Sequence, residues 1–174
     1  MKYQDCIGPA QAPDETAGGG MRLADANINP RTGLATDYLN HFNEAIMLLE
    51  LLPACPDCIG DFLAWRPMTY REHFAASRFK GRDLAIAAYE DADPALRERL
   101  GTVVGTMTAV LLATREAMGE EMSSAAIGVV ATLAATSLKP LVARAGAVIN
   151  GEADDNDPIT PQAMVDGLMK RLSA

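Results

Sequence analysis

The amino-acid sequence predicts an all-α protein, a bundle of five to seven helices behind a flexible N-terminal arm. Ala, Leu and Met are good helix formers and are plentiful, while aromatic residues make up only 5% of the chain. From residue 36 onward, apolar residues recur at spacings of three and four, as on one face of an α-helix. No alternating run of strand length stands out, although the β-branched residues of 127–133 leave one strand open.

Residues 1–35 are rich in Gly, Pro, Ala and polar residues, and they bury too little surface to offset their ordering entropy. We therefore expect a flexible or extended arm over 1–35 and a single helical domain over 36–174. The first twenty residues hold one Lys and no apolar run, so no secretory signal is expected. Met21 directly follows three glycines, and an alternative start at this residue is a hypothesis.

The first helix of the domain is expected to begin at Thr36 and to end before Pro53 and Pro56. Its apolar residues share one side at 3.6 residues per turn. They are Tyr38, Phe42, Ala45, Ile46, Leu49 and Leu52. A short second helix is expected over 59–65, before Pro67.

A capping box predicts the start of a further helix at Thr69, with Glu72 three residues later. This helix is expected to reach about Lys80. Gly81 either ends it or lies inside a longer helix that continues to Glu90.

The clearest amphipathic helix is expected over 94–118. Asp93 supplies an N-cap carboxylate, and Pro94 suits the first helical position. Gly101 and Gly105 lie four residues apart and would permit close approach of a neighbouring helix.

Residues 124–150 predict a helix of a different kind, because the stretch from Ala125 to Leu138 carries no charge. A helix that is apolar or small on every side is expected at the buried centre of a bundle. The alternative is a membrane span, but the uncharged run is shorter than the roughly 20 residues required. Pro140 is expected to bend this helix and Gly151 to end it. An acidic loop over 152–157 and a last helix over 160–172 are expected to follow.

Fifteen basic and twenty-three acidic residues give the chain a net charge of −8. This charge repels phosphate backbones and anionic lipids, so neither nucleic acid nor membrane is an expected partner. Three cysteines are an odd number and form no disulfide framework. We therefore expect a cytoplasmic protein.

The most informative polar cluster is Asp37, Asn40, His41 and Glu44, which fall within about a 100° arc of one helix. Leu48 and Leu51 continue the stripe, so these polar residues are expected either to line the mouth of a crevice or simply to face water. With His73 they form the candidate ligand site. His41 and Glu44 are candidate ligands of a divalent metal, because a histidine beside carboxylates can bind one or act as an acid or base.

Cys55 and Cys58 form a CxxC motif flanked by loop. Zinc would need His41 and His73 to complete its ligands, and a thioredoxin-type site would need a preceding strand that the sequence does not predict. The favoured interpretation is two loop cysteines packed against the bundle, while a redox-active pair stays open.

Trp65, Arg66, Tyr70 and Arg71 lie close together around a proline turn. Aromatic and arginine side chains together often form the centre of a protein interface. The four residues are therefore candidate interaction residues, with a core position for Trp65 as the alternative.

No phosphate-binding loop, nucleotide fingerprint, nucleophile elbow or zinc-protease motif is present, so no catalytic residue is assigned. The sequence favours a small, non-enzymatic helical protein that binds another protein or a second copy of itself. The alternative is a helical bundle with a buried metal or small-ligand site around Asp37, His41 and Glu44. A redox-sensing thiol pair is the third hypothesis.

Overall fold

Helices make up the regular secondary structure of the part of the chain that the structure describes. This computed structural model describes residues 22–118, 122–152, 166–167 and 170. In chain order the elements are η1 (Thr36–Leu39), α2 (Asn40–Leu51), η2 (Pro56–Cys58), α3 (Ile59–Ala64), α4 (Tyr70–Ala76), α5 (Arg82–Asp91), α6 (Pro94–Ala117) and α7 (Ser124–Asn150). The all-α prediction is confirmed. The acidic loop and most of the predicted last helix lie outside the described residues.

Residues 22–35 pack against the domain, so the predicted arm is too long at this end. Ile28 and Leu34 are buried, and the hydroxyl of Thr32 donates a hydrogen bond to the carbonyl of Ile149, at 2.6 Å. Gly33 has a φ of +70°, and a side chain there would lie 2.8 Å from the carbonyl oxygen of Ala88. These contacts link residues far apart in the sequence, and local composition does not reveal them.

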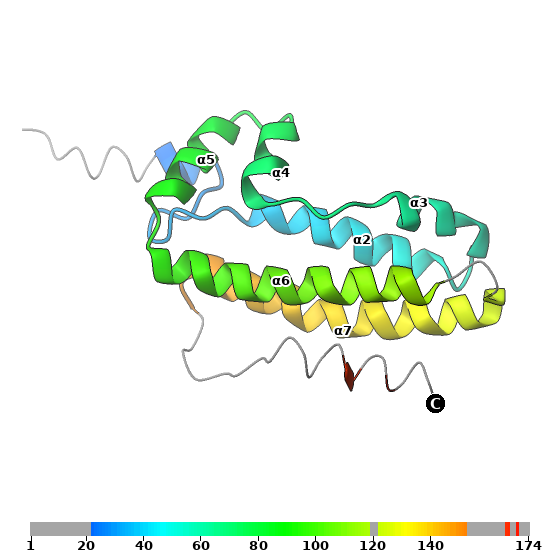
Figure 1. Cartoon of the computed structure of the whole chain (residues 1–174). Helices are drawn as coiled ribbons and strands as arrows, with labels where there is room; N and C mark the ends of the chain where they lie inside the picture. Colours follow the sequence, from blue (N-terminus) through cyan, green and yellow to red (C-terminus); the bar gives the residue numbers. More distant parts are fainter. Residues whose placement is uncertain (1–21, 119–121, 153–165, 168–169, 171–174) are drawn as a thin grey trace, which may run out of the picture.

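The apolar stripe predicted for the first helix is buried as expected. Its first turn is a 3₁₀ helix, η1, which continues directly into α2. α3 follows the proline loop and lies beside α2 (Figure 1).

The capping box that opens α4 is confirmed: the Thr69 hydroxyl accepts from the Glu72 N–H, and the Glu72 carboxylate accepts from the Thr69 N–H. The helix ends at Ala76, before the expected boundary. The Ser77 hydroxyl donates to the Phe74 carbonyl and accepts from the Phe79 N–H, which favours a turn over a continued helix. Gly81 then precedes a separate helix, α5.

α6 begins at the predicted cap, where the Asp93 carboxylate accepts from the Ala95 N–H at 2.8 Å. The prediction of close helix approach at Gly101 and Gly105 is wrong, because both are exposed and a side chain there would have nothing within 4 Å.

α7 is the central helix, since it packs against α6 on one side and α2 on the other (Figure 1). α2 and α7 run antiparallel: Leu39 approaches Gly146, and Glu50 pairs with Lys139. α7 is not buried on every side, which corrects the sequence prediction. Val129 is 60% exposed on the free side.

α7 also runs through Pro140 without interruption and ends at Gly151, whose φ is +68°. Pro140 and Thr136 both lie on the exposed side of the helix. Water can therefore hydrate the carbonyl that the proline leaves unbonded.

By length and hydropathy, α7 would also be long and apolar enough to cross a membrane. Its most apolar window has a mean hydropathy of 1.6, and 39% of that window is buried inside the protein. A core helix of a soluble protein passes the same test. α7 contacts both α2 and α6 along its buried side.

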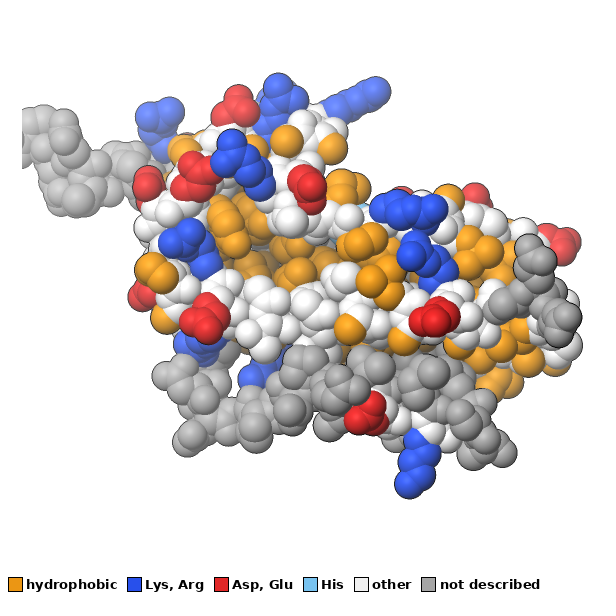
Figure 2. Space-filling view, viewed as in Figure 1, with side chains coloured by type: hydrophobic (Ala, Val, Ile, Leu, Met, Phe, Trp, Pro, Cys, Tyr) orange, Lys and Arg blue, Asp and Glu red, His pale blue; other side chains and the backbone are white. Residues whose placement is uncertain are grey.

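Charged side chains cover much of α4 and α5, whereas apolar side chains gather in the hollow between these helices, α3 and α6 (Figure 2). In the arrangement of the helices, the two long helices α6 and α7 form one layer, and α2 with its short neighbours forms the other (Figure 1).

Candidate functional site

A crevice runs between α2 and the segment formed by α3 and the α3–α4 linker, and has a volume of about 500 Å³. We call it the α2–α3 crevice. It is lined by His41, Glu44, Leu48, Asp61, Ala64, Trp65, Arg66 and Met68. The crevice therefore combines an imidazole, two carboxylates and several apolar side chains.

His41 is the buried polar residue of this crevice, with only 4% of its surface exposed. Its ring stacks on the indole of Trp65 at a centroid distance of 4.7 Å, and the Trp65 Nε1–H donates to the backbone carbonyl of His41. The imidazole Nε2 is buried and has no hydrogen-bond partner. An orphaned buried polar atom costs free energy, so it calls for an explanation.

Burial lowers the pKa of His41 below its ordinary value, and repulsion from His73 lowers it further. A hydrogen bond with the backbone of Arg66 and the charge of Glu44 act in the opposite direction without reversing the shift. The imidazole is therefore neutral at pH 7. In a neutral ring, one nitrogen donates and the other accepts. Because the backbone bond engages the other nitrogen, we assign Nε2 as the free acceptor.

His73 lies beside His41, with the ring centroids 6.0 Å apart. Burial lowers its pKa, while a hydrogen bond to the backbone of Asp37 and the charges of Asp37 and Glu44 oppose this shift. The structure thus brings together the two histidines that the sequence separates by 32 positions. His73 contacts the ring of His41, but it is not among the crevice-lining residues.

Glu44 and Asp61 are exposed and face the same crevice from α2 and α3. The guanidinium of Arg66 is engaged elsewhere, because its Nη1 donates to the carbonyls of Leu63 and Trp65 at the end of α3. Two carboxylates and one guanidinium therefore surround the neutral imidazole, and the crevice carries a net negative charge.

The structure divides the predicted polar quartet between two hollows. Asp37 and Asn40 open into a separate, polar hollow of about 530 Å³ with Asn27, Thr36, Leu39 and Asn43. For Asp37 the physical reason is the 3₁₀ turn of η1, in which each residue turns about 120° instead of 100°. The arc calculated for an α-helix therefore does not hold for Asp37.

The metal hypothesis gains no geometric support. Within the described ranges no group of three or more His, Cys, Asp or Glu side chains is placed to hold a metal ion. His41 and Glu44 share the α2–α3 crevice without a third ligand.

The predicted interaction cluster is not an exposed patch. Trp65 and Tyr70 are buried in the core, at 8% and 4% exposure. Arg66 binds the carbonyls at the end of α3, and Arg71 forms an ion pair with Glu90 of α5. Trp65 and Arg66 fix the start of the α3–α4 linker, Tyr70 packs α4 against the core, and the exposed Arg71 connects α4 to α5.

Sequence reasoning missed Asp61, Ala64 and Met68 as crevice residues. A signal for Asp61 was present: it lies four residues before Trp65, so the helix predicted over 59–65 places both on one face. Met68 lies in the linker, where no periodicity indicates a direction.

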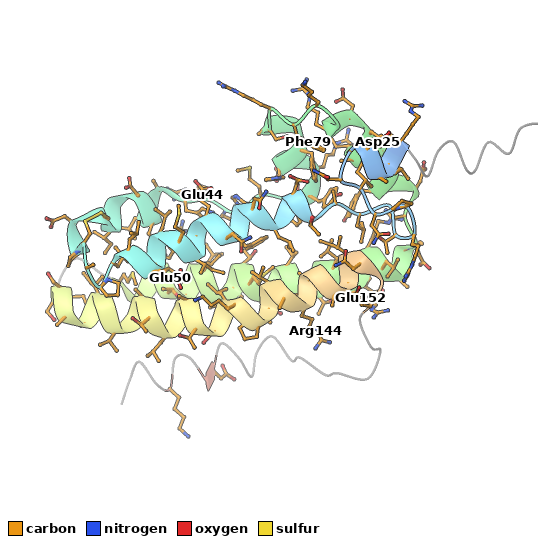
Figure 3. All side chains as sticks on the ribbon, turned by 180° about the vertical axis from the view of Figure 1, so that it is seen from behind. Asp25, Glu44, Glu50, Phe79, Arg144 and Glu152 are labelled. Carbon is orange, nitrogen blue, oxygen red and sulfur yellow. A yellow bond between two sulfur atoms is a disulfide. The ribbon has the colours of Figure 1, made fainter. Side chains whose placement is uncertain are left out.

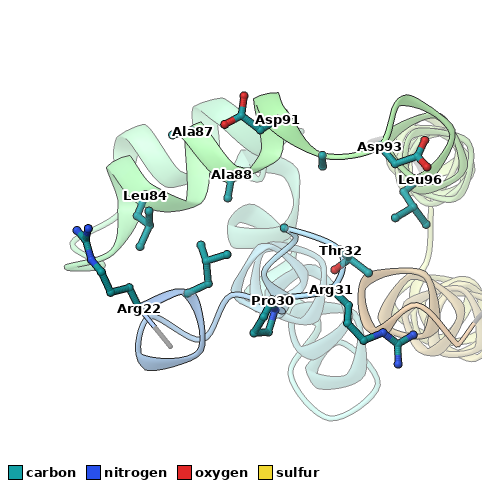
Figure 4. Close-up of a pocket in the computed structure, with 13 residues that line it drawn as sticks. Arg22, Pro30, Arg31, Thr32, Leu84, Ala87, Ala88, Asp91, Asp93 and Leu96 are labelled. Carbon is teal, nitrogen blue, oxygen red and sulfur yellow. The ribbon is translucent and has the colours of Figure 1, made fainter. Parts of the chain in front are cut away.

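A third hollow, of about 440 Å³, lies between residues 22–33, α5 and the start of α6 (Figure 4). Its charged side chains, among them Arg22, Arg31 and Asp91, point away from one another. Arg31 donates to the Gly151 carbonyl, and Asp93 caps α6. Since these polar groups serve the fold and do not converge, we do not assign a site here.

Cys55 and Cys58 form a disulfide in the loop between α2 and α3, with their Cα atoms 5.6 Å apart. The loop placement is as predicted. The bond between the two cysteines corrects the expectation of unpaired cysteines, on which the cytoplasmic prediction depended. The disulfide also leaves no thiolate for the zinc alternative. A ring of four residues is short, so the cross-link stabilises the fold by only about 2 kcal/mol in the chain-entropy treatment.

Comparison of the chain with protein-family models, with curated proteins and with solved structures finds no match.

Proposed function

We propose that this chain binds a small organic amine in the α2–α3 crevice. The observation that carries the proposal is the buried His41 imidazole, which lines the crevice and whose Nε2 lacks a partner. A ligand that donates a hydrogen bond to Nε2 would satisfy this atom. Nε2 itself is buried, so binding includes a small shift of the rings around it.

The charge and the apolar walls narrow the ligand class. Glu44 and Asp61 supply two negative charges against the one positive charge of Arg66. Arg66 is held on the Leu63 and Trp65 carbonyls, and among the described residues neither carboxylate has a salt-bridge partner. Leu48, Trp65 and Met68 supply apolar surface. A protonated amine on a short hydrocarbon body fits both features, because its N–H groups are donors and its body is apolar.

The test is a comparison of butylamine with butyrate, which share size and differ in charge. We expect butylamine to raise the melting temperature and to shift the His41 ring signals in NMR spectra, and butyrate to do neither. Because a charge pair near a protein surface contributes on the order of 1 kcal/mol, Glu44→Gln should weaken binding several-fold.

The matched control is Glu50→Gln. Figure 3 places Glu44 on the side of α2 toward α3 and Glu50 toward α7, and Glu50 pairs with Lys139 outside the crevice. Glu50→Gln should leave amine binding unchanged. Equal effects of amine and carboxylate, or equal effects of the two variants, would overturn the proposal.

A second candidate function is self-association through the side of the bundle formed by α2 and α7. It is favoured by the large hydrophobic side chains that the described chain leaves exposed, namely Met47, Leu51 and Val129. The exposed Thr132 and Thr136 bond their hydroxyls to carbonyls four residues earlier, at 2.8 Å, so they need no water partner. For both candidates we propose a soluble protein of the cytoplasm.

Light scattering at increasing protein concentration tests this second candidate. We expect a dimer that Val129→Asp converts to monomer, because a buried carboxylate without a partner is costly. Thr102→Asp, at an exposed position of α6, is the control and should leave the dimer intact. A monomer at every concentration would remove this candidate and leave the amine proposal untouched.

A further inference from the structure

We propose that the Cys55–Cys58 pair is a thiol–disulfide exchange site that accepts two electrons from a dithiol on a polypeptide. The pair is closed as a disulfide over four residues, and both cysteines are partly exposed. An accessible disulfide of this kind can be attacked by an external thiolate, whereas a buried one cannot.

The loop keeps its shape without relying on the sulfur–sulfur bond. The Cys55 N–H donates to the Leu51 carbonyl at 2.9 Å, and the Cys58 N–H donates to the Cys55 carbonyl at 3.0 Å. Cys58 directly precedes α3, and η2 contacts both α2 and α7. The two thiols of the reduced form would therefore stay close together, which favours reversible closure.

The cross-link also stabilises the fold less than a long-range disulfide would. It closes a ring of only four residues, so it restricts the unfolded chain far less than a long-range disulfide does. The segments that it joins are already held by the backbone bonds of the loop. A redox role therefore explains the pair better than a structural role.

An apolar hollow of about 410 Å³ lies beside this loop and points to the substrate class. It is lined by Pro53, Ser124, Ala125, Gly128, Val129, Thr132 and Leu133. Pro53 stands two residues before Cys55, and its Cα would lie 3.4 Å from a side chain at Gly128. Neither cysteine is among the lining residues, so the hollow would hold an apolar residue of the substrate that lies near its reacting cysteine in the sequence.

The reaction balances without a further reagent. A substrate thiolate attacks one sulfur of the pair, the Cys55–Cys58 bond breaks, and the other cysteine leaves as a thiolate that takes up a proton. The second substrate thiol then loses its proton, and its thiolate attacks the mixed disulfide. The substrate leaves as a disulfide, and the protein is left with two thiols.

The test uses the full chain with Cys6→Ser, so that Cys55 and Cys58 are the reacting cysteines. The probe is a reduced synthetic peptide with two cysteines and a neighbouring leucine. We expect the peptide to be oxidised and the protein to gain two alkylatable thiols, with an unchanged circular-dichroism spectrum. A serine at either position should abolish the oxidation of the peptide, since a single thiol cannot accept both electrons as a disulfide.

Val129→Asp separates exchange at this site from non-specific chemistry, and the variant is compared with the unchanged chain at a concentration where light scattering shows both to be monomers. It should slow exchange with the leucine peptide about tenfold, as expected for the loss of one apolar contact, and leave exchange with dithiothreitol unchanged. If the disulfide could be reduced only in a denaturant, its role would be structural and the proposal would be overturned. Thiols that stay free in excess oxidised glutathione, or peptide oxidation no faster than by glutathione itself, would also overturn the proposal. None of these outcomes depends on amine binding.

Discussion

The hydroxyl groups of two buried tyrosines connect segments that are far apart in the sequence. Tyr70 accepts a hydrogen bond from the Ala35 N–H at 2.9 Å, and Tyr38 donates one to the Met68 carbonyl at 2.8 Å. The two rings are themselves in contact, with centroids 5.1 Å apart. Residues 22–35 and the α3–α4 linker are thereby fixed to the same aromatic cluster.

Tyr70→Phe is expected to destabilise the fold by about 1–3 kcal/mol, because it leaves the buried Ala35 N–H without an acceptor. The measurement is the urea midpoint. Tyr89→Phe is the control, since Tyr89 stacks on Tyr70 at 4.3 Å and is only partly buried. Equal losses in both variants would show that ring packing, rather than the hydroxyl, matters here.

Two glycines should respond to alanine with opposite signs. Gly33→Ala is expected to cost more than 1 kcal/mol, because its φ is +70° and the new methyl group would meet the Ala88 carbonyl at 2.8 Å. Gly105→Ala lies on the open side of α6 and should stabilise the protein by about 0.4–1 kcal/mol. Thermal unfolding of both variants checks the pair, and stabilisation by Gly33→Ala would contradict the close contact.

At the scale of elements, the helix starts were predictable because their signals are local. Asp93 with Pro94, and Thr69 with Glu72, cap their helices as the sequence indicates. The end of α4 at Ala76 was not predicted, because the bonds of the Ser77 hydroxyl compete with a continued helix and leave no periodic pattern.

The candidate site was predictable only in part, because the sequence shows local spacing but not how the helices pack. The spacing of His41 and Glu44 on one helix placed both in the crevice. Its other wall depends on how α3 packs against α2, which the spacing within either helix does not determine. The burial of His41 under Trp65 is likewise a tertiary contact.

Asp93→Ala is expected to destabilise the protein by about 1 kcal/mol, because the Ala95 N–H at the start of α6 loses its acceptor. Asp91→Ala removes the same charge two residues earlier without removing a cap, so its effect should be a few tenths of that size. Chemical denaturation of the two variants gives the difference. Equal effects would assign the loss to charge instead of capping.

At the scale of the whole molecule, α7 supports both layers of the bundle with only part of its surface. Its buried residues face α6 and α2, and its other side carries Val129, Thr132 and Thr136. Composition alone could not separate these sides, because small and apolar residues occupy both. The exposed side is also where the proposed self-association and the hollow beside the disulfide meet.

The same bundle should lose stability at both ends of the pH range. Burial lowers the pKa of His41 and His73 below 6.5, and it raises that of Tyr38 and Tyr70 above 10.0. Below pH 6.5 the unfolded state binds more protons than the folded state at the histidines, so stability falls as the pH falls. Above pH 10 the unfolded state loses protons that the folded tyrosines keep, so stability falls as the pH rises.

Urea unfolding across the pH range measures the free energy of unfolding. The contribution of the two histidines and two tyrosines to this free energy should be constant from about pH 7 to about pH 9. The double variant His41→Gln and His73→Gln should flatten the decline between about pH 6.5 and pH 5, where the carboxylates of the chain have barely begun to titrate. Tyr70→Phe should reduce only the alkaline decline, which makes the two variants controls for each other. An acid decline that keeps its slope in the double variant would mean that the buried histidines do not set this limit, and that carboxylates elsewhere in the bundle do.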